Sequence, residues 1–183
     1  MTVYIVLGNG FEEIEAIAPG DILRRGGVDV RYLGIDGLSL RGGHNITVMA
    51  DSGIDMLTGV TADDLVVIPG GLGGVESIEG SAKAMELLAF ARDRGARFAA
   101  ICAGPRVLAK LGILTGKNIT CYPGNEGDMK GATVNLDINT MQDGDLITGR
   151  APGAAYDFGL KLLESVKGVA AANEVRAQMY YDV

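Results

Sequence analysis

The chain has 183 residues and a formal net charge of −7 at pH 7, with a pI near 4.7. This length favours one domain over residues 1–183, large enough to bury a core without disulfide or metal staples. The acidic balance argues against nucleic acid or an anionic membrane surface as a partner. No apolar run approaches the roughly 18 residues of a membrane span. The opening MTVYIVLG lacks the basic stretch of a signal peptide and is interpreted as a first strand.

The chain contains two cysteines, Cys102 and Cys121, and one histidine, His44. Neither the number nor the spacing of these residues fits a disulfide framework or a zinc site. We therefore expect no metal and no cofactor. Free thiols without a secretion signal predict a reducing, cytoplasmic location.

The N-terminal half alternates apolar, β-type runs with helical periodicity. The predicted elements are a strand at 3–7, a helix spanning 14–23 with a kink at Pro19, strands at 28–35, 46–49 and 65–68, and a helix at 84–91.

The C-terminal half continues the alternation. The predicted elements are a strand at 98–101, a helix from Pro105, strands at 119–122, 134–141 and 146–148 with an Asp143-Gly144 hairpin turn, and helices at 158–166, opened by Pro152, and at 169–179. Strands alternating with helices predict an α/β fold with a mostly parallel sheet. Such sheets build their sites at the carboxyl ends of the strands.

One strand end carries a cysteine. The apolar run 98–101 leads into Cys102, and a helix begins almost at once behind it. Gly104 permits an unusual backbone, and Pro105 suits the first position of a helix. The sulfur would then lie near free amides at a helix N-terminus, which favour a thiolate. The alternative is an inert, buried cysteine in a turn of small residues.

Acidic residues follow the first strand. The loop beginning at Gly8 lacks both the dinucleotide-binding and the phosphate-loop patterns. We interpret Glu12 and Glu13 as residues that stabilise a helix N-terminus. Glu15 lies close to the apolar face of the predicted helix, so it points either into the sheet crevice or to the surface.

A third strand ends in Pro69-Gly70-Gly71. Paired glycines at a strand end expose backbone N–H groups that can hold an oxyanion, although the same residues also make common turns. Should the three strands be neighbours, Glu15, Gly70-Gly71 and Cys102 converge on one site.

Five stretches together resemble the DJ-1/ThiJ/PfpI superfamily, over essentially the full length of the chain. They are GFEEIEAIAPGDILRRGG, LVVIPGG, AAICAGP, YPGNE and TGRAPGAAYDF. The resemblance implies a flavodoxin-like three-layer sandwich of the class I glutamine amidotransferase type, usually a homodimer. It also implies a nucleophilic Cys102, an acidic partner at Glu15, and an oxyanion pocket formed by the amides of Gly71 and Ala103, next to Gly70.

Two positions depart from the family pattern. Ala103 stands where the protease-like branch has a histidine, which argues against a peptidase. Tyr122 stands where another branch has a histidine, so a simple Cys-His-Glu mechanism does not carry over.

Three further residues match family positions near the pocket. Arg25 and Arg150 either hold an anionic group or serve as structural arginines. His44 either approaches the site of a partner subunit or has a structural role at the surface.

The thiolate hypothesis depends on Glu15. Lowering the thiol pKa by about three units requires roughly 4 kcal/mol, whereas a helix dipole supplies about 0.3–1 kcal/mol. A hydrogen bond from a protonated Glu15 to the sulfur would supply much of the remainder. The two groups would then share one proton.

The resemblance implies a glyoxalase III or deglycase that acts on small reactive aldehydes such as methylglyoxal. The main alternative is a redox sensor or stress chaperone, in which Cys102 oxidises to a sulfinate without turnover. A third alternative is a structural dimer with an inert cysteine.

Overall fold

A computed structural model of the chain describes residues 1–181. At its centre is a seven-stranded sheet with the order β10-β11-β7-β6-β1-β2-β5. The strands are β1 (Thr2–Leu7), β2 (Asp29–Gly34), β5 (Ser52–Gly53), β6 (Leu65–Ile68), β7 (Arg97–Ile101), β10 (Thr140–Asp143) and β11 (Leu146–Gly149). The neighbouring strands pair in parallel except at the edge, where β10 runs antiparallel to β11. The predicted mostly parallel α/β sheet is confirmed.

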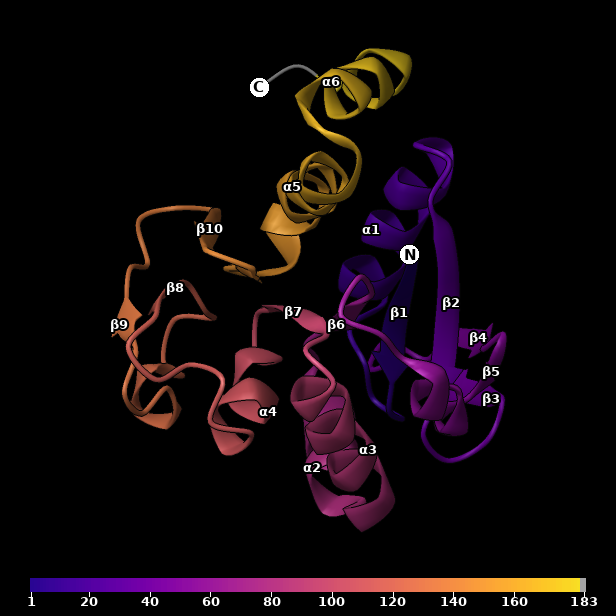
Figure 1. Cartoon of the computed structure of the whole chain (residues 1–183), viewed down its shortest axis with the longest axis vertical. Helices are drawn as coiled ribbons and strands as arrows, with labels where there is room; N and C mark the ends of the chain where they lie inside the picture. Colours follow the sequence, from indigo (N-terminus) through magenta and orange to yellow (C-terminus); the bar gives the residue numbers. More distant parts are fainter. Residues whose placement is uncertain (182–183) are drawn as a thin grey trace.

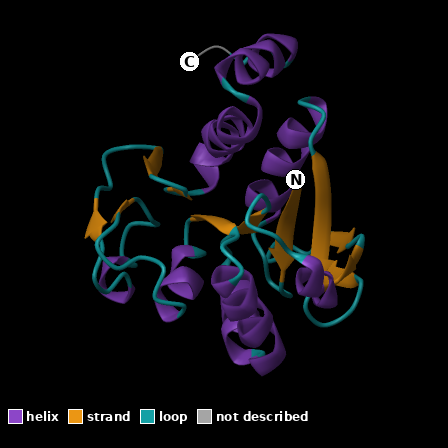
Figure 2. Cartoon of the chain, in the orientation of Figure 1, coloured by secondary structure: helices purple, strands orange, loops and turns teal. Residues whose placement is uncertain are grey.

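Helices cover both faces of this sheet (Figures 1 and 2). They are α1 (Glu13–Arg25), α2 (Leu72–Gly80), α3 (Ala82–Asp93), α4 (Pro105–Lys110), α5 (Ala155–Lys167) and α6 (Val169–Gln178). Figure 1 shows α1, α5 and α6 on one side of the sheet and α2, α3 and α4 on the other. The result is the expected three-layer sandwich. None of the helices in residues 1–181 combines the length and apolar character needed to cross a membrane.

Two small sheets and three short 3₁₀ helices complete the structure. The small sheets are β3 (Ser39–Arg41) with β4 (Thr47–Met49), and β8 (Asn118–Ile119) with β9 (Thr133–Val134); the 3₁₀ helices are η1 (Ile54–Gly59), η2 (Glu126–Asp128) and η3 (Pro152–Ala154).

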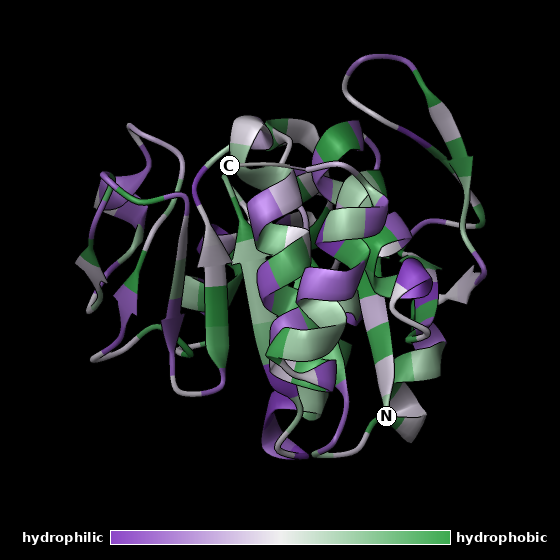
Figure 3. Cartoon of the chain, turned by 90° about the horizontal axis from the view of Figure 1, so that it is seen from above, coloured by the Kyte–Doolittle hydropathy of each residue, from purple (hydrophilic) through white to green (hydrophobic). Residues whose placement is uncertain are grey.

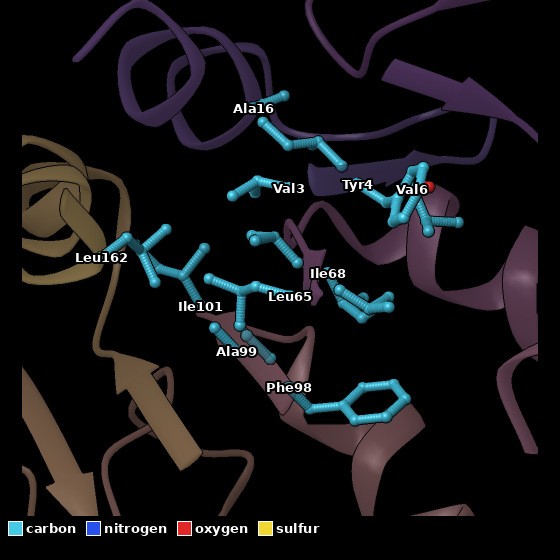
Figure 4. Close-up of a cluster of buried hydrophobic side chains, with 14 of the residues drawn as sticks. Val3, Tyr4, Val6, Ala16, Leu65, Ile68, Phe98, Ala99, Ile101 and Leu162 are labelled. Atoms are coloured by element: carbon cyan, nitrogen blue, oxygen red, sulfur yellow. The ribbon is translucent and has the colours of Figure 1, made fainter. Parts of the chain in front are cut away.

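The middle strands are buried on both faces, which explains their unbroken apolar sequence. Every residue of β6 is buried, as are the last four of β7. Figure 4 shows Val3, Leu65 and Ile101 in one cluster with Ala16 from α1 and Leu162 from α5. Apolar colour accordingly dominates the middle strands in Figure 3. Because helices close over both faces, these strands cannot shift without opening the core.

Helix α2 was not predicted, because glycines hide its pattern. A side chain at Gly74 would lie 2.7 Å from the Cα of Phe11, so glycine is needed where α2 packs on the loop after β1. That close approach fixes the position of α2 beside the start of α1.

Two predicted strands were too long. The strand expected at 119–122 ends at Ile119, since Thr120 N donates to the Thr148 side chain at 2.9 Å instead of to a neighbouring strand. The strand expected at 134–141 is divided into β9 and β10. Between them, Asp137 N donates to the Asn135 side chain at 2.9 Å, a local turn that interrupts the strand.

The hairpin turn falls one residue later than predicted. Asp143 pairs with Leu146 in the ladder, so Gly144 and Asp145 form the turn. Gly144 has φ +63°, a conformation that favours glycine.

Replacement of Phe158 by alanine tests how strongly α5 is anchored to the sheet. Phe158 is 0% exposed, and removing a buried phenylalanine side chain leaves a cavity that costs about 3–5 kcal/mol. We expect a loss of that size in urea denaturation. The matched control is Phe90→Ala, because Phe90 is 41% exposed and should lose much less. Equal losses would contradict the assignment of α5 to the core.

Candidate active site

Cys102 forms a sharp turn between β7 and α4. Its φ is +64°, a left-handed conformation that is uncommon for a residue other than glycine and is found often at functional sites. Two backbone hydrogen bonds hold it: Cys102 N donates to Gly149 O at 2.9 Å, and Tyr122 N donates to Cys102 O at 2.9 Å. The predicted strand–cysteine–helix turn is therefore present.

The unusual backbone was expected at Gly104, and this detail is wrong. Gly104 has helical angles, with φ −53°. Glycine is required there for space, because a side chain would collide with the backbone oxygen of Ile68. The turn thus packs directly against the end of β6.

Glu15 lies in the first turn of α1 and is 0% exposed. Its Oε2 accepts a hydrogen bond of 2.7 Å from Gly70 N, and its carboxyl lies near enough to Cys102 for each group to shift the pKa of the other. A side chain at Gly70 would lie 2.5 Å from Glu15 Oε2 and 2.7 Å from Cys102 Cβ. Only glycine leaves room for the acid and the cysteine to meet. Of the two alternatives for Glu15, the structure has the one in the sheet crevice.

Backbone amides complete the surroundings of the sulfur. The backbone groups of Gly71 and Ala103 lie beside Cys102, and each lowers the pKa of its thiol. Gly71 has φ +85°, which turns the chain after β6 toward the loop that precedes α1. There Glu12 N donates to Gly70 O at 3.0 Å. This contact ties the loop before α1 to the glycines that face Cys102.

Burial dominates the ionisation of the pair. It raises the pKa of Glu15 to about 7, with hydrogen bonds from Cys102 and Gly70 acting in the opposite direction and the charge of Glu12 adding to the rise. Near neutral pH a large share of Glu15 is therefore protonated.

The pKa of Cys102 moves opposite to the prediction. Burial raises it, and the charge and hydrogen bond of an ionised Glu15 raise it further. The expected low thiol pKa is thus wrong while Glu15 carries a charge. The contribution from Glu15 depends on its own proton, because a neutral acid carries no charge and donates a hydrogen bond to sulfur. The pair consequently titrates as one unit.

The two arginines are both engaged outside the Glu15–Cys102 pair. Arg25 lies at the far end of α1 and pairs with Asp21 at 2.7 Å. Arg150 follows Gly149 in sequence, but its guanidinium donates to Leu136 O and the Asn139 side chain. The structural interpretation of each arginine fits these contacts within the chain.

Tyr122 and Cys121 adjoin the turn at Cys102. Tyr122 bonds Cys102 through its backbone N–H, while its side chain is largely exposed. Cys121 is fully buried, and burial raises its pKa to about 11. Cys121 therefore has the properties of an inert core thiol.

Glu13 has a role that the sequence did not reveal. We interpreted it as a residue stabilising a helix end, but it is buried and accepts hydrogen bonds from His44 N at 2.8 Å and His44 Nδ1 at 3.0 Å. It thereby fastens the β3–β4 hairpin to α1. The two glycines that precede His44 are the only sequence signal for this contact, because Gly42 leaves space for the Glu13 carboxylate.

One group of residues could hold a metal ion. Ligand atoms of Glu12, Glu13 and His44 lie within 4.8 Å of one another. The Nδ1–Glu13 hydrogen bond already links two of them. It raises the pKa of His44, which is 70% exposed.

The other missed contribution is the backbone oxygen of Gly149, which holds the amide of Cys102. Sequence could indicate it only through the TGR segment, residues 148–150, at the end of the last strand.

Comparisons with known proteins agree with this fold. The model of the DJ-1/PfpI family matches residues 1–165, and the chain belongs to this family. It is 38% identical over 175 residues to protein dj-1beta of Drosophila melanogaster, covering 93% of this chain and 92% of that protein. The crystal structure of Drosophila DJ-1beta superposes with a TM-score of 0.92 at 33% identity and covers 100% of both chains.

Two other relatives carry names that describe an activity. A Caenorhabditis elegans protein named glutathione-independent glyoxalase DJR-1.2 is 33% identical over 165 residues, covering 90% of this chain and 87% of that protein. A Pyrococcus abyssi protein named as a deglycase is 31% identical over 168 residues, covering 91% of this chain and 100% of that protein.

The raised pKa of Glu15 predicts a pH-dependent stability. Between about pH 4.5 and 7 the folded protein keeps a proton that the unfolded chain has lost, so this contribution is complete below about 4.5 and is lost as pH rises through about 7. The stability difference between wild type and Glu15→Gln should fall by about 3 kcal/mol over this range, at about 1.36 kcal/mol per pKa unit. Urea denaturation at several pH values measures it.

Glu13→Gln is the matched control. Burial raises the pKa of Glu13, but its hydrogen bonds with His44 and Ile46 outweigh burial and lower it. Its own stability contribution is therefore lost only at pH values below about 4.5, and the wild-type minus Glu13→Gln difference should stay level from there to about pH 6; above that it declines, because Glu13 also raises the pKa of His44. A level difference for Glu15→Gln as well would refute the raised Glu15 pKa.

Proposed function

We propose that the protein is a cysteine-dependent enzyme of the glyoxalase III or deglycase type, acting on small reactive aldehydes such as methylglyoxal. The observation that carries the proposal is the buried Glu15 carboxyl, which contacts both Cys102 and the Gly70 amide. The names of the two relatives given above support the same class of activity.

The pair has a natural place for one proton. Oε2 of Glu15 already accepts from Gly70 N, which makes it the poorer site for a proton. Oε1 has no hydrogen-bond partner among residues 1–181. A proton on Oε1 makes the acid neutral and so removes the charge that raises the pKa of Cys102, which favours the thiolate form.

The proposed reaction needs no external oxidant or reductant. The Cys102 thiolate attacks the aldehyde carbon, and Glu15 protonates the resulting oxyanion, which the amides of Gly71 and Ala103 stabilise. The Glu15 carboxylate next removes the proton from that carbon and delivers it to the neighbouring carbon, while the hydroxyl proton of the first carbon passes to the oxygen of the second; the product is a thioester of lactate with Cys102. Water then cleaves the thioester, releases lactate and restores the thiolate.

Redox sensing is the second candidate. Cys102 is 8% exposed, so the residue is not completely closed off from solvent. The free Oε1 of a protonated Glu15 could donate a hydrogen bond to a sulfinate. The two functions differ in stoichiometry, because a sensor consumes oxidant once whereas an enzyme forms lactate repeatedly.

We also propose that the protein is a homodimer. An apolar groove of about 440 Å³ lies along α1, lined in part by Ile14, Ile17, Ile46 and Tyr156. These four side chains are between 39% and 57% exposed, and a cluster of large apolar side chains at the surface is typical of an interaction face.

Cys102→Ser should abolish lactate formation from methylglyoxal, because a neutral hydroxyl without a base is a poor nucleophile. Glu15→Gln should slow turnover by about 10²-fold or more, as expected for a positioned proton carrier. A lactate assay on purified protein measures both.

Cys121→Ser is the matched control and should keep wild-type turnover. Equal loss in the two cysteine variants would remove Cys102 from the mechanism. Wild-type protein that forms no lactate, but takes up peroxide once at Cys102, would favour the sensor instead.

Ile17→Asp should shift the protein toward the monomer, since it puts a charge into the apolar groove on α1. Sedimentation velocity at several concentrations measures the shift. A wild-type protein that sediments as a monomer throughout would refute the dimer.

A further inference from the structure

A partly buried ion-pair cluster joins α2 to α4, on the side of the sheet away from α1 (Figure 1). Glu79, in the last turn of α2, is only 7% exposed. Its Oε2 lies 3.0 Å from Arg106 Nη2 and 3.0 Å from Lys110 Nζ, both in α4. Arg106 is itself 20% exposed, and its Nε lies 3.5 Å from Asp128 Oδ2.

The ion pairs of Glu79 are expected to add little to the free energy of unfolding. Exposed ion pairs contribute about 0–1 kcal/mol, and a buried pair often contributes no more than apolar side chains of similar volume. Glu79 Oε1 also has no hydrogen-bond partner among residues 1–181. What the cluster provides is a directional link between two helices.

These two helices begin at the groups that face the sulfur. Helix α2 starts at Leu72, directly after Gly71, and α4 starts at Pro105, two residues after Ala103. The backbone groups of Gly71 and Ala103 lie beside Cys102 and lower the pKa of its thiol. The relative position of α2 and α4 therefore sets the spacing of these two donors.

On the α4 side, the ion-pair cluster lies close to the amide of Ala103. Helix α4 has only six residues, so Arg106 is close to the turn at Cys102. A side chain at Gly104 would collide with Ile68 O and would lie 3.1 Å from Pro69 O. A movement of α4 is consequently passed on to the strand end that carries Gly70 and Gly71.

We propose that Glu79 is a positioning residue, which acts through Arg106 and Lys110 to hold the amides of Gly71 and Ala103 at the spacing that stabilises the Cys102 thiolate and the reaction oxyanion. This inference rests on the proposed function for its role in turnover. Its effect on the reactivity of Cys102 is independent of any turnover.

The test uses Cys121→Ser as the background, because Cys102 is then the only thiol in the chain. Glu79→Gln keeps the shape of the side chain and removes its charge. We expect iodoacetamide to alkylate this variant at least about threefold more slowly at pH 7, with the midpoint of the pH profile shifted upward, because displaced amides stabilise the thiolate less. Turnover of methylglyoxal should fall about tenfold in kcat with KM changed less than about twofold.

Asp143→Asn is the matched control. Asp143 is a partly buried carboxylate that pairs with Lys117 at 3.5 Å and accepts from Asn118 N at 2.8 Å, linking β10 to β8 and not α2 to α4. It should leave the alkylation profile unchanged. An unchanged profile in Glu79→Gln, or an equal shift in Asp143→Asn, would overturn the proposal.

Arg106→Gln tests the same contact from the other helix, and it decides the question should Glu79→Gln fail to fold. It should slow alkylation in the same direction, and the double variant should be no slower than Glu79→Gln alone, because Glu79→Gln already removes the Glu79–Arg106 contact. Additive losses would overturn the proposal. Wild-type protein without turnover would refute the proposed function, while the alkylation profiles would still test Glu79.

Discussion

The contact between the buried Glu15 carboxyl, the Gly70 amide and the Cys102 side chain is the constraint on which the candidate site depends. A carboxyl with no solvent exposure is costly to ionise, and burial raises its pKa to about 7. Burial of the Glu15 carboxyl is tolerated because its Oε2 accepts a hydrogen bond of 2.7 Å from the Gly70 amide. Glycine at position 70 also leaves room for Cys102 beside the acid. Acid, sulfur and amides thus form one titrating unit.

The remaining elements hold this unit from several directions. Gly149 on β11 and the backbone of Tyr122 fix the left-handed turn at Cys102. The loop before α1 is tied to the Gly70 backbone through Glu12 N. Farther out, Glu13 fastens the β3–β4 hairpin and Glu79 fastens α4 to α2. Three buried or nearly buried glutamates in an acidic chain therefore have three different roles, which are set by the partners that the fold gives them.

The thiol pKa shows how strongly these surroundings act. A helix N-terminus and two amides are commonly taken to favour a thiolate, yet burial and an ionised Glu15 raise the pKa of Cys102. The protonation state of Glu15 decides which influence prevails. Such coupling belongs to the pair and not to either residue alone.

Much of the fold could be predicted because it depends on local signals. Apolar runs such as 65–68, helical spacing in α1 and α5, and turn residues at strand ends are properties of neighbouring residues, and they specify an α/β sheet. These local signals did not predict elements whose bounds depend on contacts between residues distant in sequence. Helix α2 is rich in glycine because it packs on Phe11, and the strand at 119 ends because Thr120 bonds Thr148.

For the site, the sequence by itself determined the turn that carries Cys102, the glycines after β6 and the acid in α1, each visible from a few adjacent residues. Only the tertiary structure decided that Glu15 points into the crevice, that Glu13 is buried, and that the side chain of Glu79 is nearly buried. The physical reason is that burial and hydrogen-bond partners arise from segments distant in sequence, which periodicity does not encode.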